Sequence, residues 1–541
     1  MTIVTFSAIE FFAEFSRVGS AIAAAEAAAE TSATVTPDHP SPNHRSPDAS
    51  PPTPAAPAHS KVYIQQIKVL GSRVFREWEL ANVTQPFEDK DLSLEELQQV
   101  ADLVTRYYLD HGYMTSRVVL ADQTIENDTL YLQAIEGNLE AIEIEGTRRI
   151  NPKYVHQRLM RAQRSPLNQD SLEQSLRLLK SDPLFSHVEA SLREGKQAGN
   201  SILNVQITES KSWSGHLSID NYNPSTIGAL SVSGLVGLRN VSGQGDSLFA
   251  YHSQSLTGGS QQNQILYQRP LNAMQGTISL RFSPNHFKIT QPELEEFNIT
   301  GRSDLLELSI RQPIVRQPAE EIALSLSFVK QRGETSIADY LANSQQSTLL
   351  RFGQEILRRD YKGVWTAHSQ FNFGRTHSET NAEGGTNFIT WAGQLQRLQF
   401  LGKNHAVTLG MNWQFANQAL PASQQFTLGG AQSLRGYPNS FLSGDNGISA
   451  FIEQQFVLQR DQLGQPRLKV SSLLDIGTVW NHITPDQNIS KAELFRSLGL
   501  GVSWHPSSQW SIKVDVAFPL QSIANSPAFS PALYFQSHYQ F

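Results

Sequence analysis

Residues that could carry out catalysis are hard to find in this chain of 541 residues. It has no cysteine, so it can form neither a disulfide nor a thiolate metal site nor a cysteine nucleophile. The patterns G-x-S-x-G and H-E-x-x-H and the P-loop are absent, and the 15 histidines show no spacing typical of metal ligands. We therefore expect no enzyme, no metal site and no cofactor, and we interpret the scattered histidines as pore lining.

One arginine stands out for where it lies rather than for any reaction. The stretch LGGAQSLRGY (428–437) contains Leu434, Arg435, Gly436 and Tyr437, in a region that otherwise alternates like membrane strands. A guanidinium with little water around it is costly unless it is paired. Arg435 therefore needs a carboxylate partner, unless its loop is simply solvated.

Asp475 is the carboxylate that we expect to pair with Arg435. It lies in LLDIG (473–477), two residues before Gly477, on a segment that should be a strand facing the inside of a barrel. An aspartate can accept two hydrogen bonds from one guanidinium, and glycines allow the loop backbone to approach a wall closely. We predict an ion pair between Arg435 and Asp475 inside the barrel, with Tyr437 packed nearby.

The elements that must position this pair are β-strands. In WSIKVDVAF (510–518) apolar and polar residues alternate, which is typical of strands in a lipid-facing barrel. Sixteen such runs occur after residue 210, an even number, as in single-chain outer-membrane barrels. A soluble β-sandwich or propeller would also alternate. We predict strands at 212–222, 225–239, 244–256, 261–273, 276–288, 302–316, 320–332, 345–360, 363–377, 386–403, 405–418, 447–460, 466–480, 493–505, 508–519 and 529–541.

Two further features favour a transmembrane barrel over residues 210–541. Loop 419–446 joins the eleventh and twelfth predicted strands, contains Arg435, and is expected to fold inward. The last predicted strand ends in ALYFQSHYQF, whose apolar face carries Leu533, Phe535, Tyr539 and Phe541. Bacterial outer-membrane barrels commonly end in such a strand. We therefore expect contact with outer-membrane lipid and, during biogenesis, with the barrel assembly machinery.

Residues 61–208 are more densely charged than the predicted barrel and contain an internal repeat. IKVLGSRVF (67–75) matches IEIEGTRRI (142–150) at an offset of 75. Three leucines coincide at the same offset, Leu92, Leu97 and Leu103 with Leu167, Leu172 and Leu178. Each copy contains a strand, a helical region and two further strands. We predict two small α+β domains, 61–137 and 138–209; the alternative is one larger α+β domain.

The first 60 residues differ in composition from everything that follows. Residues 1–30 are apolar and alanine-rich, and they are either a secretory signal or an amphipathic helix that plugs the pore. Residues 31–60 are rich in proline, serine and alanine, which predicts a disordered linker.

Charge and hydropathy exclude two classes of protein. The net charge is -7 and the sequence pI is about 6.1, so no basic surface for nucleic acid is expected. No run of 18 or more apolar residues is present, which excludes an ordinary transmembrane helix.

The order of these segments resembles a known family. A helix-like segment, a proline-rich linker, two repeats and a sixteen-stranded barrel resemble the outer-membrane transporters of two-partner secretion, the TpsB proteins of ShlB/FhaC haemolysin-activator type. These belong to the BamA-type superfamily of barrels with POTRA domains. Leu434-Arg435-Gly436-Tyr437 matches the [VI]RG[YF] tip of the family's sixth extracellular loop, with leucine at the first place. Asp475 and Gly477 match its x-x-D-x-G motif on strand 13.

This resemblance implies a location, a partner and a mechanism. The repeats would be periplasmic POTRA domains that capture an unfolded, large, β-helical exoprotein, and the barrel in the outer membrane would export it. The alternative within the superfamily is an insertase that assembles outer-membrane barrels. A porin would need neither the repeats nor the paired motifs.

Overall fold

The computed structural model describes residues 61–541 except 126, 163–164, 198, 380–384, 483–492 and 524–526. The predicted signal or plug helix (1–30) and the predicted linker (31–60) lie outside the described residues. The described chain divides into two compact units, 61–210 and 211–541. In this part of the chain no helix is long and apolar enough to span a membrane.

The smaller unit begins with a sheet covered by helices. Strand β2 (Gln66–Leu70) pairs in parallel with β5 (Thr129–Ile135), and β4 (Arg117–Leu120) pairs with the other side of β5. Helix α3 (Leu94–Asp110) begins at a capping box, because Ser93 and Glu96 each bond the other's backbone N–H. The remaining elements are β1 (Val62–Ile64) paired with β3 (Lys90–Leu92), α2 (Glu77–Thr84) and the 3-10 helix η1 (Gln85–Phe87).

The second half of this unit repeats the arrangement. Its sheet has the order β6-β8-β7, in which the first strand is again parallel to the last, as in β2-β5-β4. The strand, helical region, strand, strand order predicted for each copy is therefore present twice. The elements are β6 (Leu139–Glu145), α4 (Pro152–Leu159), η2 (Met160–Ala162), α5 (Gln169–Lys180), β7 (Phe185–Glu194) and β8 (Ser201–Glu209).

The repeat alignment needs one correction. The first two leucine pairs are buried in both halves, but Leu103 is 41% exposed and Leu178 is only partly buried. Val104 and Leu179 take their place in the two cores. The helix face was therefore assigned one residue too early, because Leu103 and Leu178 lie beside the buried stripe rather than on it. The predicted boundaries of the two domains stay a prediction.

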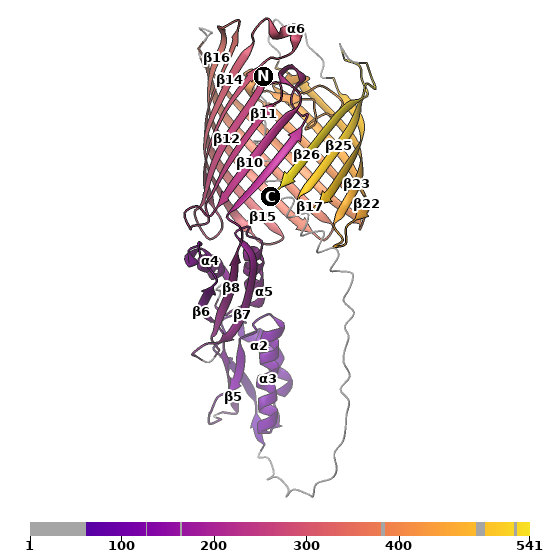
Figure 1. Ribbon diagram of the computed structural model, residues 1–541. Helices are drawn as coiled ribbons and strands as arrows, with labels where there is room; N and C mark the ends of the chain where they lie inside the picture. Colours follow the sequence, from indigo (N-terminus) through magenta and orange to yellow (C-terminus); the bar gives the residue numbers. More distant parts are fainter. Residues whose placement is uncertain are drawn as a thin grey trace. The chain divides into compact units, whose positions relative to one another are not determined.

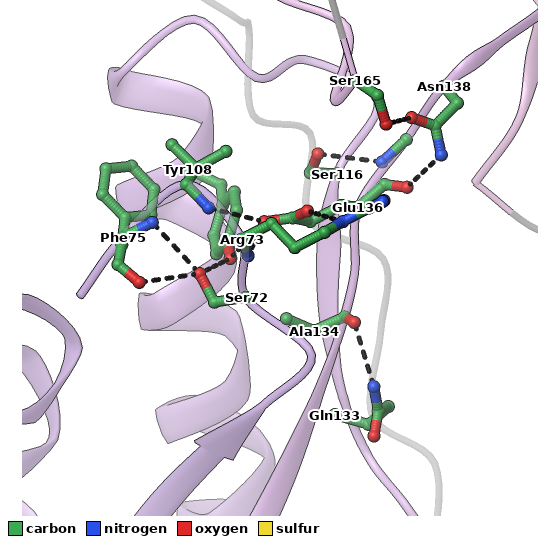
Figure 2. Close-up of polar contacts among 12 residues, drawn as sticks. Ser72, Arg73, Phe75, Tyr108, Ser116, Gln133, Ala134, Glu136, Asn138 and Ser165 are labelled. Atoms are coloured by element: carbon green, nitrogen blue, oxygen red, sulfur yellow. Dashed lines mark hydrogen bonds and ion pairs between the residues drawn. The ribbon is translucent and has the colours of Figure 1, made fainter. Parts of the chain in front are cut away.

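A buried carboxylate fixes the loop that follows β2. Glu136 accepts hydrogen bonds from the backbone N–H of Arg73 (2.7 Å) and of Val74 (3.2 Å) and from Nε of Arg73 (3.1 Å) (Figure 2). The hydroxyl of Tyr108 also lies within hydrogen-bonding distance of Glu136 and bonds Ser72 at 2.7 Å. Burial, with a further contribution from the charge of Glu136, raises the pKa of Tyr108 to about 12.

The larger unit is a closed antiparallel barrel of sixteen strands, in which β9 pairs with both β10 and β26 (Figure 1). The fold class predicted from the sequence is confirmed. The barrel strands are β9 (Trp213–Asp220), β10 (Ser231–Arg239), β11 (Ser247–Ser255), β12 (Ser260–Pro270), β13 (Thr277–Lys288), β14 (Thr300–Arg316), β15 (Glu320–Ile337), β16 (Tyr340–Asp360), β17 (Gly363–Ser378), β18 (Thr386–Gly402), β19 (His405–Ala416), β22 (Asn446–Arg460), β23 (Pro466–Trp480), β24 (Phe495–Ser507), β25 (Trp510–Pro519) and β26 (Ala532–Gln540).

Each predicted run corresponds to one of these strands, with two differences in length. The run 225–239 begins too early, because residues after Pro224 form the 3-10 turn η3 (Ser225–Ile227) before β10 starts. Strands β15 and β16 are longer than predicted, since they continue to Ile337 and from Tyr340. Polar side chains occupy both faces there, so the alternation that marks a strand disappears. The short helix α6 (Pro292–Glu295) lies in the loop between β13 and β14.

The outward face of the barrel carries a continuous apolar belt. Five exposed residues on adjacent strands are paired side by side, and we call them the belt row: Leu280, Leu308, Phe328, Leu350 and Phe373. The residues between them along each strand face inward and are polar or small, such as Arg281, Glu307 and Ser327. This is the arrangement of a barrel whose outer surface meets lipid.

Candidate functional site

The candidate site is built on loop 417–445, which joins β19 to β22, the eleventh and twelfth strands of the barrel. The loop contains the 3-10 helix η4 (Ala422–Gln424) and a small hairpin of β20 (Phe426–Leu428) and β21 (Leu442–Gly444). A bridge between Gly430 and Leu434 tightens the turn that carries Arg435.

Arg435 is held by Asp475 through three hydrogen bonds. The backbone N–H of Arg435 and its Nε donate to Oδ2 of Asp475 at 3.0 and 2.8 Å, and Nη2 donates to Oδ1 at 2.5 Å. Both side chains are buried, Arg435 at 9% and Asp475 at 2% exposure. Asp475 alternates on β23 with Leu474 and Ile476, which are exposed, so it faces the interior of the barrel. The loop tip is therefore attached to the inner wall.

Three further charges surround this pair, and sequence reasoning missed them. Nη1 of Arg435 donates to Glu453 Oε2 on β22 at 3.3 Å. On β25, Lys513 lies 3.2 Å from Asp515 and 3.9 Å from Glu453. All three occupy inward positions of their strands, but many inward positions are polar. Only strand register shows which of them meet at the loop tip.

Tyr437 fixes the second side of the tip. Its ring is buried and lies edge-on to Phe495 at 5.6 Å between centroids. Its hydroxyl donates to the carbonyl of Arg496 (2.9 Å) and lies 2.8 Å from Gln521 Oε1. Tyr534, on the last strand, accepts from the Gly436 N–H at 3.0 Å and donates to the Tyr437 carbonyl at 3.2 Å. The tip therefore touches strands β23 to β26.

Two glycines are required by close approach rather than by flexibility. A Cβ at Gly436, where φ is 93°, would lie 2.9 Å from the backbone nitrogen of Pro519. A Cβ at Gly477 would lie 2.5 Å from Cδ1 of Leu428 on the loop hairpin. Such contacts are closer than carbon atoms tolerate, so the loop seats on the wall only because these positions lack side chains.

Apolar packing completes the attachment. Leu434 is fully buried in a cluster with Leu428, Tyr437 and Phe495. The structure thus brings all six residues predicted for the site, Leu434, Arg435, Gly436, Tyr437, Asp475 and Gly477, to one contact between loop and wall. This arrangement binds a loop inside a pore, and its groups are used in bonds to one another rather than presented to a substrate.

Comparison with known proteins identifies the family. The sequence model described as haemolysin secretion/activation protein ShlB/FhaC/HecB matches residues 199–504. The chain belongs to this family. The ShlB-type POTRA domain model matches residues 62–137. As a member of the ShlB/FhaC/HecB family, the protein is an outer-membrane transporter of two-partner secretion, with its POTRA region in the periplasm.

Individual relatives are distant but cover most of the chain. The heme/hemopexin transporter protein HuxB of Haemophilus influenzae (strain 86-028NP) is 24% identical over 472 residues, 82% of this chain and 81% of HuxB. The structure is similar to CdiB from Escherichia coli, with a TM-score of 0.70, 19% identity, and 91% and 93% of the two chains covered. BamA from Haemophilus ducreyi matches with a TM-score of 0.56 and 14% identity, over 89% of this chain and all of that one, which shows a shared fold alone.

Proposed function

We propose that this ShlB/FhaC/HecB-family transporter exports its partner through the barrel, and that the attachment of loop 417–445 to β23 sets the conformation in which export occurs. The observation that carries the proposal is the buried pair of Arg435 and Asp475. Burying two charges is costly unless their geometry is good. A loop with no role inside the pore would gain more from an apolar contact or from lying in solvent.

The POTRA region provides the means to receive the partner. Its two sheets have unpaired edges among the described residues, at β2 and β4 in the first and at β6 and β7 in the second. An extended chain can add a strand to such an edge through main-chain hydrogen bonds, which do not require a particular sequence. We propose that the unfolded exoprotein is captured in this way, and that the domains follow the boundaries 61–137 and 138–209.

The other proposed partners follow from the barrel surface. The exposed belt row fits the acyl chains of outer-membrane lipid. The outward aromatic residues Phe535 and Tyr539 of β26 fit recognition by the barrel assembly machinery. No catalysis is proposed, since the buried charges of the site are paired with one another.

The test is export in cells that lack the native copy and carry a variant. Arg435→Ala should insert in the membrane but abolish secretion of the partner, because the loop loses its fixed position. Asp475→Ala should give a similar defect, and the double variant should be no worse than either single one. Additive defects, or normal secretion by Arg435→Ala at normal protein level, would show that the pair does not set the export conformation.

A matched control separates the loop from general damage to the barrel. Arg281 on β13 pairs with Glu307 on β14, and both side chains are buried. Arg281→Ala removes a buried ion pair that joins two wall strands instead of the loop. It should secrete far more partner than Arg435→Ala. Loss of the transporter should leave the assembly of other outer-membrane barrels intact, which distinguishes a transporter from an insertase.

A further inference from the structure

One side of the barrel carries a group of cations on its outward face. They lie on β13, β14, β15 and β17, toward the ends that meet loops 289–299, 338–339 and 379–385. We call them the cationic patch: Lys288, Arg302, Lys330, Arg332 and Arg375, with His286 and His377 beside them. All seven are exposed and alternate with inward residues, so they face away from the pore.

The patch lies at the extracellular end of the barrel. Strand β9 starts three residues after β8, so its first residues mark the periplasmic end, where the POTRA region is attached. Successive strands alternate in direction, and β13, β15 and β17 therefore end at the extracellular side. The patch occupies the last residues of these strands and the first residues of β14.

Strand register places the patch directly beside the apolar belt. Lys330 follows Phe328 by two residues and Arg375 follows Phe373 by two, one outward position beyond the belt row in each case. Two residues of a strand span about 7 Å. The change from apolar to cationic is therefore completed within the distance over which a membrane changes from acyl chains to headgroups.

The far end of the patch is hollowed. A cavity of about 330 Å³ opens here on four adjacent strands, where Gln261 pairs with His286, His286 with Arg302, and Arg302 with Glu334. Lys288 and Ser336 line its second row, on either side of Thr300. The cavity thus presents Lys288, Arg302 and His286 to one small polar group.

The patch keeps a positive charge after its ion pairs are counted. Arg302 pairs with Asp304 at 2.7 Å, and Arg332 pairs with Glu334 at 2.7 Å and with Glu379 at 3.7 Å. Lys288, Lys330 and Arg375 have no carboxylate partner within the part of the chain that the structure describes. These three charges are exposed and outward, so an external anion can reach them.

The opposite side of the barrel is different at the same end. The outward residues near the extracellular ends of its strands include Trp413, Trp480, Phe518 and Leu533. Arg496 is an isolated, exposed outward cation there, on β24. A solvated extension of the strands would not explain why charge gathers on one side and aromatic residues on the other.

We propose that the cationic patch binds the phosphate-bearing headgroup of an outer-leaflet lipid whose acyl chains lie against the belt row. The belt supplies the apolar surface for the chains, and cations near a membrane surface attract anionic headgroups. The long side chains of Lys330 and Arg375 can reach from the edge of the belt to the phosphates. The exported chain is a poorer fit for this surface, because the patch faces away from the pore.

The test uses the full-length protein in detergent, titrated with bis-phosphorylated lipid A and followed by native mass spectrometry. The triple variant Lys288→Gln, Lys330→Gln, Arg375→Gln should bind about 100-fold more weakly, at about fivefold for each cation. Lipid A without its phosphates should bind the native protein as weakly as the variant binds the phosphorylated form. Arg496→Gln, an outward cation outside the patch, should bind normally.

Several results would overturn the proposal. Equal affinity of the triple variant and the native protein would do so, as would equal binding of phosphorylated and dephosphorylated lipid A. If inorganic phosphate at the same concentration displaced the lipid, the site would recognise phosphate and not a lipid. If the triple variant bound lipid normally but secreted less partner, the patch would serve the exported protein instead. Folding of each variant is checked by the circular dichroism of its strands.

Discussion

Arginines are held by a carboxylate in the same way in both units of this protein. In each case one carboxylate accepts a hydrogen bond from the backbone N–H and another from Nε of the same arginine, and we call this a carboxylate clasp. Its three instances are Glu136 with Arg73 (2.7 and 3.1 Å), Glu209 with Arg149 (2.8 and 3.2 Å) and Asp475 with Arg435 (3.0 and 2.8 Å).

The clasps differ in how much water reaches the arginine. The side chains of Arg73 and Arg149 are 63% and 46% exposed, whereas that of Arg435 is 9% exposed. The three carboxylates are all buried. In the POTRA region the carboxylate therefore serves the backbone of a loop, and the guanidinium adds little. In the barrel both charges are out of water, and each depends on the other.

The largest effect is expected where both partners are buried. Arg435→Ala leaves Asp475 without its cation, which for a buried pair costs about 3–5 kcal/mol. The loop tip should then leave the wall for part of the time. Because the chain has no cysteine, Leu434→Cys supplies a single reporter at a fully buried position of the tip. A maleimide should label it slowly in the native background and quickly in Arg435→Ala.

The control for this experiment is the same reporter with Arg281→Ala, which breaks a buried wall pair. Labelling there should stay slow. Fast labelling of Leu434→Cys without any second substitution would show that the tip leaves the wall readily by itself, and the contrast between the two units would fail.

A smaller loss is expected from the carboxylate of a half-exposed clasp. Glu136→Ala leaves the N–H groups of Arg73 and Val74 without their acceptor, and an unsatisfied buried donor costs about 1–3 kcal/mol. Residues 61–209, which we expect to be soluble alone with mixed α/β circular dichroism, allow the change to be measured by urea unfolding. A loss as large as that of Arg435→Ala would mean that burial of the arginine does not separate the two kinds of clasp.

The sequence revealed the barrel clasp but not the POTRA clasps, and the reason is physical. A charged residue in a lipid-like stretch needs a partner, which identified Arg435 and Asp475. Glu136 and Glu209 lie in soluble domains where charge is ordinary, and they are 73 residues apart rather than 75. The repeat also paired Arg73 with Arg148, whereas Arg149 bonds Glu209 in the structure. Insertions of one or two residues in loops shift such partners without disturbing the alternation that marks strands.

The neutral anchor of the loop tip should matter less than its charged one. Tyr437→Phe removes the hydrogen bonds to the Arg496 carbonyl and to Gln521 but keeps the packing against Phe495. A neutral hydrogen bond contributes about 1 kcal/mol. Labelling of the Leu434→Cys reporter should therefore be intermediate between the native background and Arg435→Ala. Labelling as fast as in Arg435→Ala would assign the attachment to tyrosine and not to the clasp.

The second POTRA clasp should be visible as a pH dependence of stability. Burial acts to raise the pKa of Glu209, but the N–H groups of Ile150, Arg148 and Arg149 outweigh it and hold this pKa below its usual value. A lowered folded-state pKa stabilises the fold above the unfolded value of about 4.3, and this stability is lost as the pH falls through the folded value. Glu209→Gln should flatten the decline of stability below about pH 4.3. An unchanged profile would contradict it.

The smallest effect should come from removing the exposed arginine of a clasp. In Arg73→Ala the backbone N–H of residue 73 still donates to Glu136, and only the bond from Nε is lost. Because the Arg73 side chain is 63% exposed, water replaces that bond, and exposed pairs contribute about 0.2–1 kcal/mol. Urea unfolding of residues 61–209 should show this small shift, reduced further at high salt because exposed charges are screened. If Arg73→Ala instead destabilised the unit as much as Glu136→Ala, the guanidinium would be the essential half of the clasp in water as well as in the barrel.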